Sequence, residues 1–422
     1  MDKEKFFIKE IDSDNYLVYN SLNHIPSLLN KEGFNFFNII LKYENIDKCL
    51  DHIDKEDFKT FMHFFKTIEK SGLLDLKEHL VDFKETTLIG NGLHLFLHLT
   101  YKCNLSCRYC YNKSIRQNQD ELTVKQWKLI IDKVINNIGY ITLTGGEPTL
   151  YNGLLDIVEY IKSKREDVII DMFTNGMTDF RNKHIYTELF KYIDKITISC
   201  DSLTGRDDRL GFSPEILKSN MDWLTEFYNP KNITINSVWN SDNFENIKSV
   251  KHFADRNSVG FTFSLQIPNN RTEKENLPDV ELYNTCLCNG TFKSENISVS
   301  GINEERILTK TIKCGAASSV FSIDNMGNCF PCQVFNGSDY KLGNLLYESF
   351  KDIYNSLKAK EIRSHTVYKI EECKICKLKY ACGGGCIGDT YKLNKDIYSH
   401  PDILCPYYKN GAINNLLSVS YE

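Results

Sequence analysis

The chain has 422 residues, of which 41% are hydrophobic and 25% are charged, and its net charge is −5. This ordinary globular composition excludes a disordered, collagen-like or low-complexity protein, and the charge gives no indication of a nucleic-acid partner. No apolar run approaches the ~18 residues that span a bilayer, and the N-terminus lacks an apolar signal core, so we expect a cytoplasmic protein without a membrane partner. The unusual feature is the presence of 15 cysteines. In a reducing compartment, clustered cysteines are metal ligands more often than disulfides.

Residues 1–88 predict a small α+β module. Two short stretches of alternating apolar residues, 6–8 and 16–19, flank turn-forming residues and predict a hairpin. Helical patterns follow around residues 34–40 and 58–68, and the second ends near Gly72. Strands followed by amphipathic helices are typical of a winged-helix-like module, and a packing extension of the next domain would give the same pattern.

Residues 89–285 alternate between strand and helix patterns. Apolar segments predict strands at residues 93–99, 140–143, 168–173, 196–199, 233–235 and 261–267. Between the first two, Thr123 and Gln126 form a capping box at the start of an amphipathic helix. This alternation predicts parallel β/α units in a whole or partial barrel, where the chemistry belongs in the loops that follow the strands.

Residues 286–422 read as a connector followed by a cysteine-rich domain. The stretch 269–313 is polar and poorly periodic, so we expect irregular structure there. After residue 314 the cysteines lie in turn-rich sequence. We expect few helices or strands in this part and no hydrophobic core of its own, so that it would fold around metal.

Three cysteines follow the first barrel strand within one short loop: Cys103, Cys107 and Cys110. Their thiolates can hold three irons of a four-iron cubane and leave the fourth iron open for a substrate or cofactor. A structural zinc ion is the alternative, but it requires four ligands, and no fourth cysteine or histidine lies close in the sequence.

Further motifs follow later strands in a fixed order: Gly145-Gly146-Glu147-Pro148, Thr174-Asn175-Gly176, Ser199-Cys200-Asp201, and then Arg209. With the cysteine loop and its Tyr109, this set resembles the radical S-adenosylmethionine (radical SAM) enzymes. The resemblance implies a partial (β/α)6 barrel. It also implies that S-adenosylmethionine is bound by residues of these motifs, namely Tyr109 near the adenine, Gly145, Gly146, Glu147 and Pro148 near the methionine amine, Asn175, and Ser199, Asp201 and Arg209 near the ribose.

In the family that the chain resembles, the open iron chelates the methionine part of the cofactor. The reduced cluster then cleaves the cofactor to a 5′-deoxyadenosyl radical, which abstracts hydrogen from an unactivated C–H bond. The cofactor carries this chemistry, and the protein positions it and excludes side reactions. An external electron donor such as flavodoxin or ferredoxin is therefore expected.

The tail contains a second cysteine pattern, Cys373-x2-Cys376-x5-Cys382-x3-Cys386 and then Cys405, preceded by Cys314, Gly327 and Cys332. This pattern resembles the SPASM extension of radical SAM peptide-modifying enzymes, which carries two auxiliary clusters. The resemblance implies a distal cluster held by Cys373, Cys376, Cys382 and Cys405, and a proximal cluster held by Cys314, Cys332 and Cys386. The chain then contains three 4Fe–4S clusters.

The chain departs from the family's cysteine pattern at the fourth ligand of the proximal cluster. Its candidate is Cys329, three residues before Cys332. The alternative is that Cys329 is free and the proximal cluster has an open iron that binds a substrate thiolate. Zinc ribbons are the competing metal interpretation of the tail. We expect Cys286 and Cys288 to be incidental thiols.

With the SPASM resemblance, the N-terminal module resembles the recognition element of maturases that act on ribosomally made peptides. That element binds a leader peptide as an added strand. The expected function is therefore formation of a thioether or carbon–carbon cross-link in such a peptide. One alternative is an anaerobic sulfatase-maturing enzyme, but those enzymes have an aspartate base where this chain has Gln333. A more distant alternative is a non-enzymatic iron–sulfur or zinc peptide-binding protein.

Overall fold

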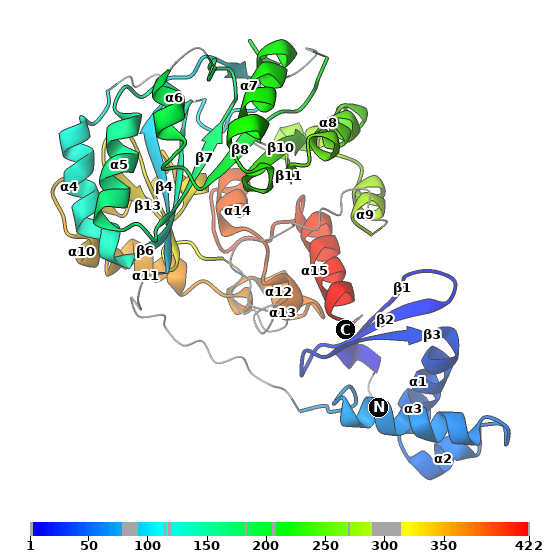
Figure 1. Cartoon of the computed structure of the whole chain (residues 1–422). Helices are drawn as coiled ribbons and strands as arrows, with labels where there is room; N and C mark the ends of the chain where they lie inside the picture. The colour runs from blue at the N-terminus through cyan, green and yellow to red at the C-terminus, as the bar shows by residue number, and fades with distance from the viewer. Residues whose placement is uncertain are drawn as a thin grey trace.

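The computed structural model describes residues 3–77, 92–113, 115–116, 120–181, 184–204, 208–268, 271–288 and 314–420. Figure 1 shows a β/α barrel part, a C-terminal region packed beside it, and an N-terminal module next to the last helix. The expected domain boundary at residue 88 lies outside the described residues. The expected boundary after residue 285 falls inside a helix, α9 (Val280–Cys288).

Parallel strands form the centre of a nine-stranded sheet with the order β11-β10-β8-β7-β6-β4-β12-β13-β14. The parallel barrel strands are β4 (Leu93–Thr100), β6 (Ile138–Gly145), β7 (Ile169–Thr174), β8 (Lys195–Ser199), β10 (Ile233–Trp239) and β11 (Gly260–Leu265). Each lies beside the strand that precedes it in sequence, as in a partial (β/α)6 barrel. The expected strands are therefore confirmed, with small differences at their ends.

Helices connect these strands and cover the outer face of the sheet (Figure 1). They are α4 (Val124–Val134), α5 (Leu154–Lys164), α6 (His184–Leu189), α7 (Pro214–Phe227) and α8 (Phe244–Arg256). The expected capping box between Thr123 and Gln126 is present at the start of α4. The apolar side of α4 buries Trp127, Ile130 and Ile131 against the sheet, because these residues recur at helical spacing.

The C-terminal region contains more regular structure than we expected. Its elements are β12 (Val320–Ile323), β13 (Asn328–Phe330), β14 (Gly343–Asn344), α10 (Phe350–Tyr354), α11 (Leu357–Arg363), α12 (Glu371–Lys374), α13 (Lys379–Cys382), α14 (Ile387–Asn394) and α15 (Cys405–Ser420). Strand β12 pairs in parallel with β4 and so extends the barrel sheet. Phe321, Phe335 and Phe350 belong to the same buried core as the barrel. The expectation of few helices and strands was therefore wrong, whereas these buried residues belong to a core shared with the barrel and not to a separate one.

The expected connector is also partly helical. A 3-10 segment (Arg271–Asn276) precedes α9. The ring of Tyr283 on α9 lies 5.2 Å from the ring of Tyr407 on α15, so this segment joins the barrel to the C-terminal helix. Residues 289–313 lie outside the described residues. Other 3-10 turns lie at Lys3–Lys5, Ile135–Asn137, Pro148–Leu150, Pro230–Asn232, Gln333–Phe335 and Val367–Lys369.

The N-terminal module consists of an antiparallel sheet followed by helices. The sheet has the order β1 (Phe6–Glu10), β2 (Asn15–Asn20), β3 (Pro26–Asn30), and the helices are α1 (Lys31–Tyr43), α2 (Ile46–Leu50) and α3 (Phe58–Lys70). The expected hairpin is confirmed by the pairing of β1 with β2. Strand β3 and helix α2 were not expected, because each is short and β3 starts with proline.

One face of this small sheet is buried against the C-terminal region. Leu17 and Tyr19 of β2 are fully buried and share a core with Leu378, Ile413 and Leu416. The module therefore packs on the cysteine-rich part of the chain, although the two lie at opposite ends of the sequence. Within the described part of the chain, no helix is both long enough and apolar enough to cross a membrane.

Candidate functional site

The three-cysteine loop begins directly after strand β4 and lies at the carboxyl end of the sheet. Cys107 belongs to a short strand, β5 (Ser106–Cys107), which pairs with β9 (Arg209–Leu210). Burial raises the pKa of Cys107 to about 11, and Cys110 and Cys103 add to this rise. The structure therefore brings the three predicted thiols together, with the register of the ribbon placing Arg209 opposite Cys107.

Two further residues hold this loop, and the sequence patterns did not reveal them. The guanidinium of Arg116 donates to the carbonyl of Leu105 at 2.7 Å and to that of Cys103 at 3.4 Å. The amide of Asn112 donates to the carbonyl of Gly145 at 2.8 Å. Both residues follow the last cysteine closely, where a polar side chain is ordinary in a loop and carries no motif.

The glycine turn after β6 packs directly on the backbone that leads into the cysteine loop. A Cβ atom on Gly145 would lie 2.1 Å from the Thr100 carbonyl oxygen, and one on Gly146 would lie 2.2 Å from that of Lys102. Only glycine allows this approach. The N–H groups of Gly146 and Glu147 donate to these two carbonyls, at 2.7 and 2.8 Å. The motif therefore sets the distance between the cysteine loop and the second barrel strand.

Glu147 is fully buried and its carboxylate is already hydrogen-bonded by the protein. One oxygen accepts from the Thr149 N–H at 3.2 Å, the Thr149 hydroxyl at 2.7 Å and the Thr174 hydroxyl at 2.8 Å, and the other accepts from the Asn175 N–H at 2.7 Å. Burial raises the pKa of this carboxyl, and these donors oppose the rise. Glu147 therefore ties the turn after β6 to the turn after β7. Its predicted contact with the cofactor amine stays a prediction.

Asn175 reaches from the end of β7 to the cysteine loop. Its amide donates to the side-chain oxygen of Asn104 at 2.7 Å and lies 3.6 Å from the sulfur of Cys103. Pro148 begins the 3-10 turn that follows Glu147 and is buried. The motifs singled out by the sequence after the second and third strands thus converge on the three-cysteine loop.

The residues expected near the ribose and adenine form one network. Arg209 makes a salt bridge with Asp201, with Nε at 3.0 Å from the carboxylate, and both side chains are buried. The Tyr109 hydroxyl also donates to Asp201, and the Arg209 guanidinium lies 5.4 Å from the centre of the Tyr109 ring. Burial raises the pKa of the Tyr109 phenol, so it remains a donor. Ser199 ends strand β8 two residues before Asp201.

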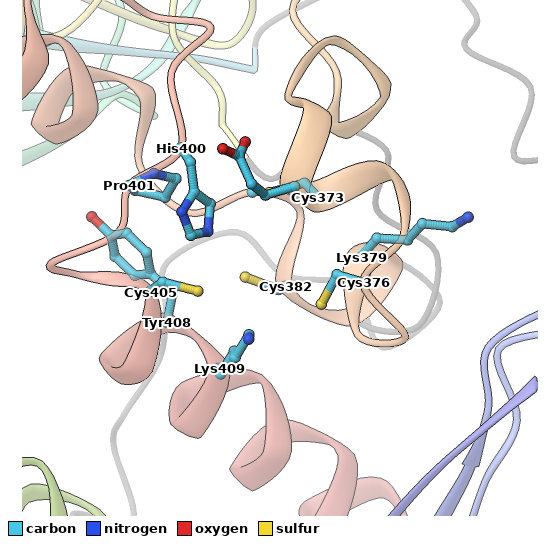
Figure 2. A pocket seen from close by; sticks show the side chains of 11 residues that line it. Cys373, Cys376, Lys379, Cys382, His400, Pro401, Cys405, Tyr408 and Lys409 are labelled. Carbon is cyan, nitrogen blue, oxygen red and sulfur yellow. The ribbon is translucent and has the colours of Figure 1, made fainter. Parts of the chain in front are cut away.

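Four cysteines of the tail line one cavity, together with Lys379, His400, Tyr408 and Lys409 (Figure 2). These are Cys373, Cys376, Cys382 and Cys405, the residues expected to hold the distal cluster. Burial raises the pKa of Cys373 to about 12, and Cys382, Cys376 and Cys405 contribute to the rise. The arrangement fits a closed four-thiolate cluster, with the ammonium of Lys409 beside Cys405 to offset part of its negative charge.

The cysteines expected to hold the proximal cluster come together from three segments. The Ala317 N–H bonds the Pro331 carbonyl at 2.9 Å, which links the chain after Cys314 to the chain before Cys332. Helix α14, which starts after Cys386, packs on the turn after Cys332, since a Cβ on Gly388 would lie 2.9 Å from Val334. Burial raises the pKa of Cys332 to about 12, with Cys314 as the next cause.

A carboxylate joins this group of thiols. Burial raises the pKa of Cys386 well above its ordinary value, and the charges of Asp389, Cys314 and Cys332 contribute in that order. Asp389 also acts on Cys314 and on Cys332. No sequence pattern singled out Asp389, because an acidic residue near the start of a helix is common.

Cys329 lies apart from this group. It is fully buried on β13, and after burial the charges that raise the pKa of its thiol are those of Asp324 and Glu348. The charges that raise the pKa of Cys332 are instead those of Cys314 and Asp389. The role of Cys329 as the fourth proximal ligand stays a prediction.

Among the described residues, no three His, Cys, Asp or Glu side chains lie close enough together to hold a single metal ion. Each site of a zinc ribbon needs such a group. A cubane spreads its ligands more widely, because each ligand binds a different iron.

Comparison with known proteins agrees with this geometry. The family model of the radical SAM superfamily matches residues 97–254, and the model of the iron–sulfur cluster-binding SPASM domain matches residues 314–377. The chain is a radical SAM enzyme with a SPASM domain. It is therefore a protein that binds S-adenosylmethionine and 4Fe–4S clusters, and the hypothesis of a non-enzymatic carrier was wrong.

Several proteins resemble this radical SAM/SPASM chain over most of its length. The sporulation killing factor maturation protein SkfB of Bacillus subtilis is 25% identical over 325 residues, which are 75% of each chain. The crystal structure of Streptococcus suis SuiB bound to its precursor peptide SuiA matches with a TM-score of 0.58 and 18% identity, over 95% of this chain and 98% of that one. The structure of anSMEcpe with bound AdoMet matches with a TM-score of 0.60 and 17% identity, over 78% of this chain and 100% of that one.

Proposed function

We propose that this enzyme matures a ribosomally made peptide by forming an intramolecular cross-link, either a thioether or a carbon–carbon bond. The observation that carries the proposal is the combination of a three-strand, three-helix module with a radical SAM barrel and a cysteine-rich tail in one packed chain. The similarity to SkfB, a maturation protein, and the fold shared with SuiB, which was crystallised with a precursor peptide, support it.

The barrel residues would hold the radical cluster and its cofactor. Cys103, Cys107 and Cys110 are the thiolates available for a cluster with one open iron. When bound, the reduced cluster and S-adenosylmethionine supply abstraction of a hydrogen atom from an unactivated carbon. The Tyr109, Asp201 and Arg209 network would fix the nucleoside side of the site, since its charges are paired and its geometry is held by the β5–β9 ribbon.

The tail would hold two auxiliary clusters, which gives three clusters in all. The distal cavity supplies four thiols, and the proximal group supplies Cys314, Cys332 and Cys386. When bound, such clusters supply one-electron redox centres. An external one-electron donor such as flavodoxin or ferredoxin would serve the radical cluster.

The N-terminal module would bind the leader of the peptide. Its sheet has two edge strands, β1 and β3, and main-chain pairing on a sheet edge is a common way of binding an extended peptide. One sheet face is closed by the C-terminal region, so an edge is the more suitable docking place. A docked leader would hold the core peptide near the barrel at up to about millimolar local concentration.

The sulfatase-maturing alternative has less support. The match to anSMEcpe covers 78% of this chain, whereas the match to SuiB covers 95%. In addition, Gln333 follows Cys332 and begins a 3-10 turn. An amide at this place cannot accept a proton at neutral pH, unlike the aspartate expected for a sulfatase-maturing enzyme.

The test uses the full-length reconstituted enzyme and the precursor peptide encoded beside its gene. Under anaerobic reducing conditions, mass spectrometry should find a product that has lost a pair of hydrogen atoms per cross-link. The C103A/C107A/C110A variant serves as the inactive control. Free leader should inhibit turnover of the whole precursor, and a leader with proline in its paired segment should not. Formylglycine in place of a cross-link would contradict the proposal.

Truncating the N-terminal module would be a poor test. Removing residues 1–88 would expose Leu378, Ile413 and Leu416, which the module buries in a shared core. Loss of activity in that variant could therefore come from a damaged tail. Leader competition leaves the enzyme intact and avoids this ambiguity.

A further inference from the structure

The proximal group contains three thiols where a closed cubane needs four ligands. Cys314, Cys332 and Cys386 are its cysteines, and residues 315–326, which follow the first of them, contain no cysteine. Cys329 lies on β13, and the charges that raise the pKa of its thiol are those of Asp324 and Glu348, whereas Cys314 and Asp389 raise that of Cys332. The three thiols of the proximal group therefore leave one iron of a cubane without a thiolate from this group.

Asp389 is placed to reach this group from helix α14. Cys386 occupies the N-cap position of this helix, and Asp389 lies three residues later in its first turn. The Asp389 carboxylate accepts a hydrogen bond from the Cys386 thiol and acts electrostatically on Cys314 and Cys332. The carboxylate thus contacts the Cys386 thiol and lies near enough to Cys314 and Cys332 for its charge to act on both, although the three thiols come from three segments of the chain.

The orientation of Asp389 is fixed from the opposite side. The Tyr408 hydroxyl on α15 donates to one carboxylate oxygen at 3.1 Å. Tyr408 in turn is packed against Gly385, where a Cβ atom would lie 2.2 Å from its ring. Carboxylate ligands of metals are usually hydrogen-bonded by a second residue, which fixes their orientation, and the Tyr408 hydroxyl does this for Asp389.

Electrostatics also favours a cation between these groups. If ionised, three thiolates and a carboxylate in this half-buried place would repel one another, and the ammonium of Lys392 is a neighbouring cation that lowers the pKa of Asp389. Iron ions would neutralise this accumulation of negative charge. Backbone N–H groups of Ala316, Ile387 and Val334 point at the sulfurs, which is typical of cysteines that hold a cluster.

We propose that Asp389 is the fourth ligand of the proximal auxiliary cluster and that its carboxylate binds the iron left free by Cys314, Cys332 and Cys386. The inference rests on the proximal cluster of the proposed function. A carboxylate is a harder donor than a thiolate. The iron it holds is therefore the one most easily lost or exchanged, and the one that an incoming thiolate would reach first.

The experiment removes the radical cluster and examines the auxiliary clusters without peptide. In the C103A/C107A/C110A background we compare the parent with D389C, D389N and C329A after anaerobic reconstitution. Each protein is analysed for iron, and EPR spectra are recorded after dithionite reduction and after mild oxidation with ferricyanide. Adding C332A to the background reports whether a proximal cluster exists.

The parent should bind about eight irons, and C332A should lower this to about four. Ferricyanide should convert the parent's proximal cluster to a three-iron form with release of ferrous iron. D389C should suppress this conversion because all four ligands become thiolates, and D389N should enhance it. C329A should behave as the parent in every measurement.

Other outcomes overturn the inference. Unchanged spectra and iron loss in both D389C and D389N would show that Asp389 is not a ligand. Loss of the proximal cluster in C329A would assign the fourth position to Cys329. If the parent and C332A both bound only about four irons, the proximal cluster itself would be absent, and the proposed function would fail at that point and not at Asp389. If both bound about eight, Cys332 would not be a ligand and the assignment of the proximal site would be wrong. D389N keeps the size of the side chain, so it remains informative if D389C folds poorly.

Discussion

The radical-cluster loop and the proximal auxiliary site are built in opposite ways. The loop carries its three cysteines within eight residues of one another, after a single strand. The proximal site collects Cys314, Cys332 and Cys386 from separate segments that are joined by the Ala317–Pro331 hydrogen bond and the contact of α14 with Val334. Local spacing therefore suffices for the first site, whereas the second exists only if the tail folds correctly.

The largest expected effect comes from removing the three cysteines of the radical-cluster loop. Changing Cys103, Cys107 and Cys110 together to Ala should abolish 5′-deoxyadenosine formation and lower the bound iron from about twelve to about eight. The loop lies outside the tail, so both auxiliary clusters should persist. Iron analysis and chromatography of the cofactor products measure this, and an iron content near four in the unaltered enzyme would contradict a three-cluster protein.

The next prediction disturbs the proximal auxiliary site without replacing any of its ligands. In Gly388→Val the new side chain would collide with Val334, because even a Cβ atom would lie 2.9 Å away. Overpacking of this kind costs about 1–3 kcal/mol and should separate α14 from the turn after Cys332. We expect loss of about four irons with the radical cluster retained. Gly411→Ala is the matched control, since no atom lies within 4 Å of its added Cβ. Full iron content in G388V would show that the proximal site does not depend on this contact.

The third prediction concerns the buried ion pair between Asp201 and Arg209, which lies beside the radical-cluster loop because Arg209 pairs with Cys107. Arg209→Met leaves the Asp201 carboxylate buried without its partner, which should lower the free energy of unfolding by about 3–5 kcal/mol. Lys191→Ala removes an exposed pair with Glu188 and should change it by less than about 1 kcal/mol. Chemical denaturation of both variants measures the difference. A similar, small loss in both would mean that the Asp201–Arg209 pair does not stabilise the fold.

The smallest expected effect concerns Glu147. In Glu147→Ala the Asn175 N–H and the Thr174 hydroxyl lose their acceptor, which should cost about 1–3 kcal/mol of stability. If Glu147 also binds the cofactor amine, the affinity for S-adenosylmethionine should fall roughly tenfold to a hundredfold. Denaturation and equilibrium binding separate the two roles. Lower stability with unchanged affinity would make Glu147 a positioning residue only.

The sequence by itself determined the elements whose signals are local. Strand and helix periodicity predicted the barrel strands, the Thr123 capping box predicted the start of α4, and cysteine spacing predicted the three-cysteine loop. The resemblance of the tail to the SPASM extension predicted the four thiols that line the distal cavity. These signals are reliable because hydrogen bonding within a helix and burial of a strand act over a few residues.

Only the tertiary structure decided the features that depend on contacts between distant segments. It extended the barrel sheet with β12, buried Leu17 and Tyr19 against the tail, and placed the Asp389 carboxylate where its charge acts on the three proximal thiols. None of these is encoded in the spacing of neighbouring residues, because burial and charge pairing depend on which surfaces meet after the chain has folded.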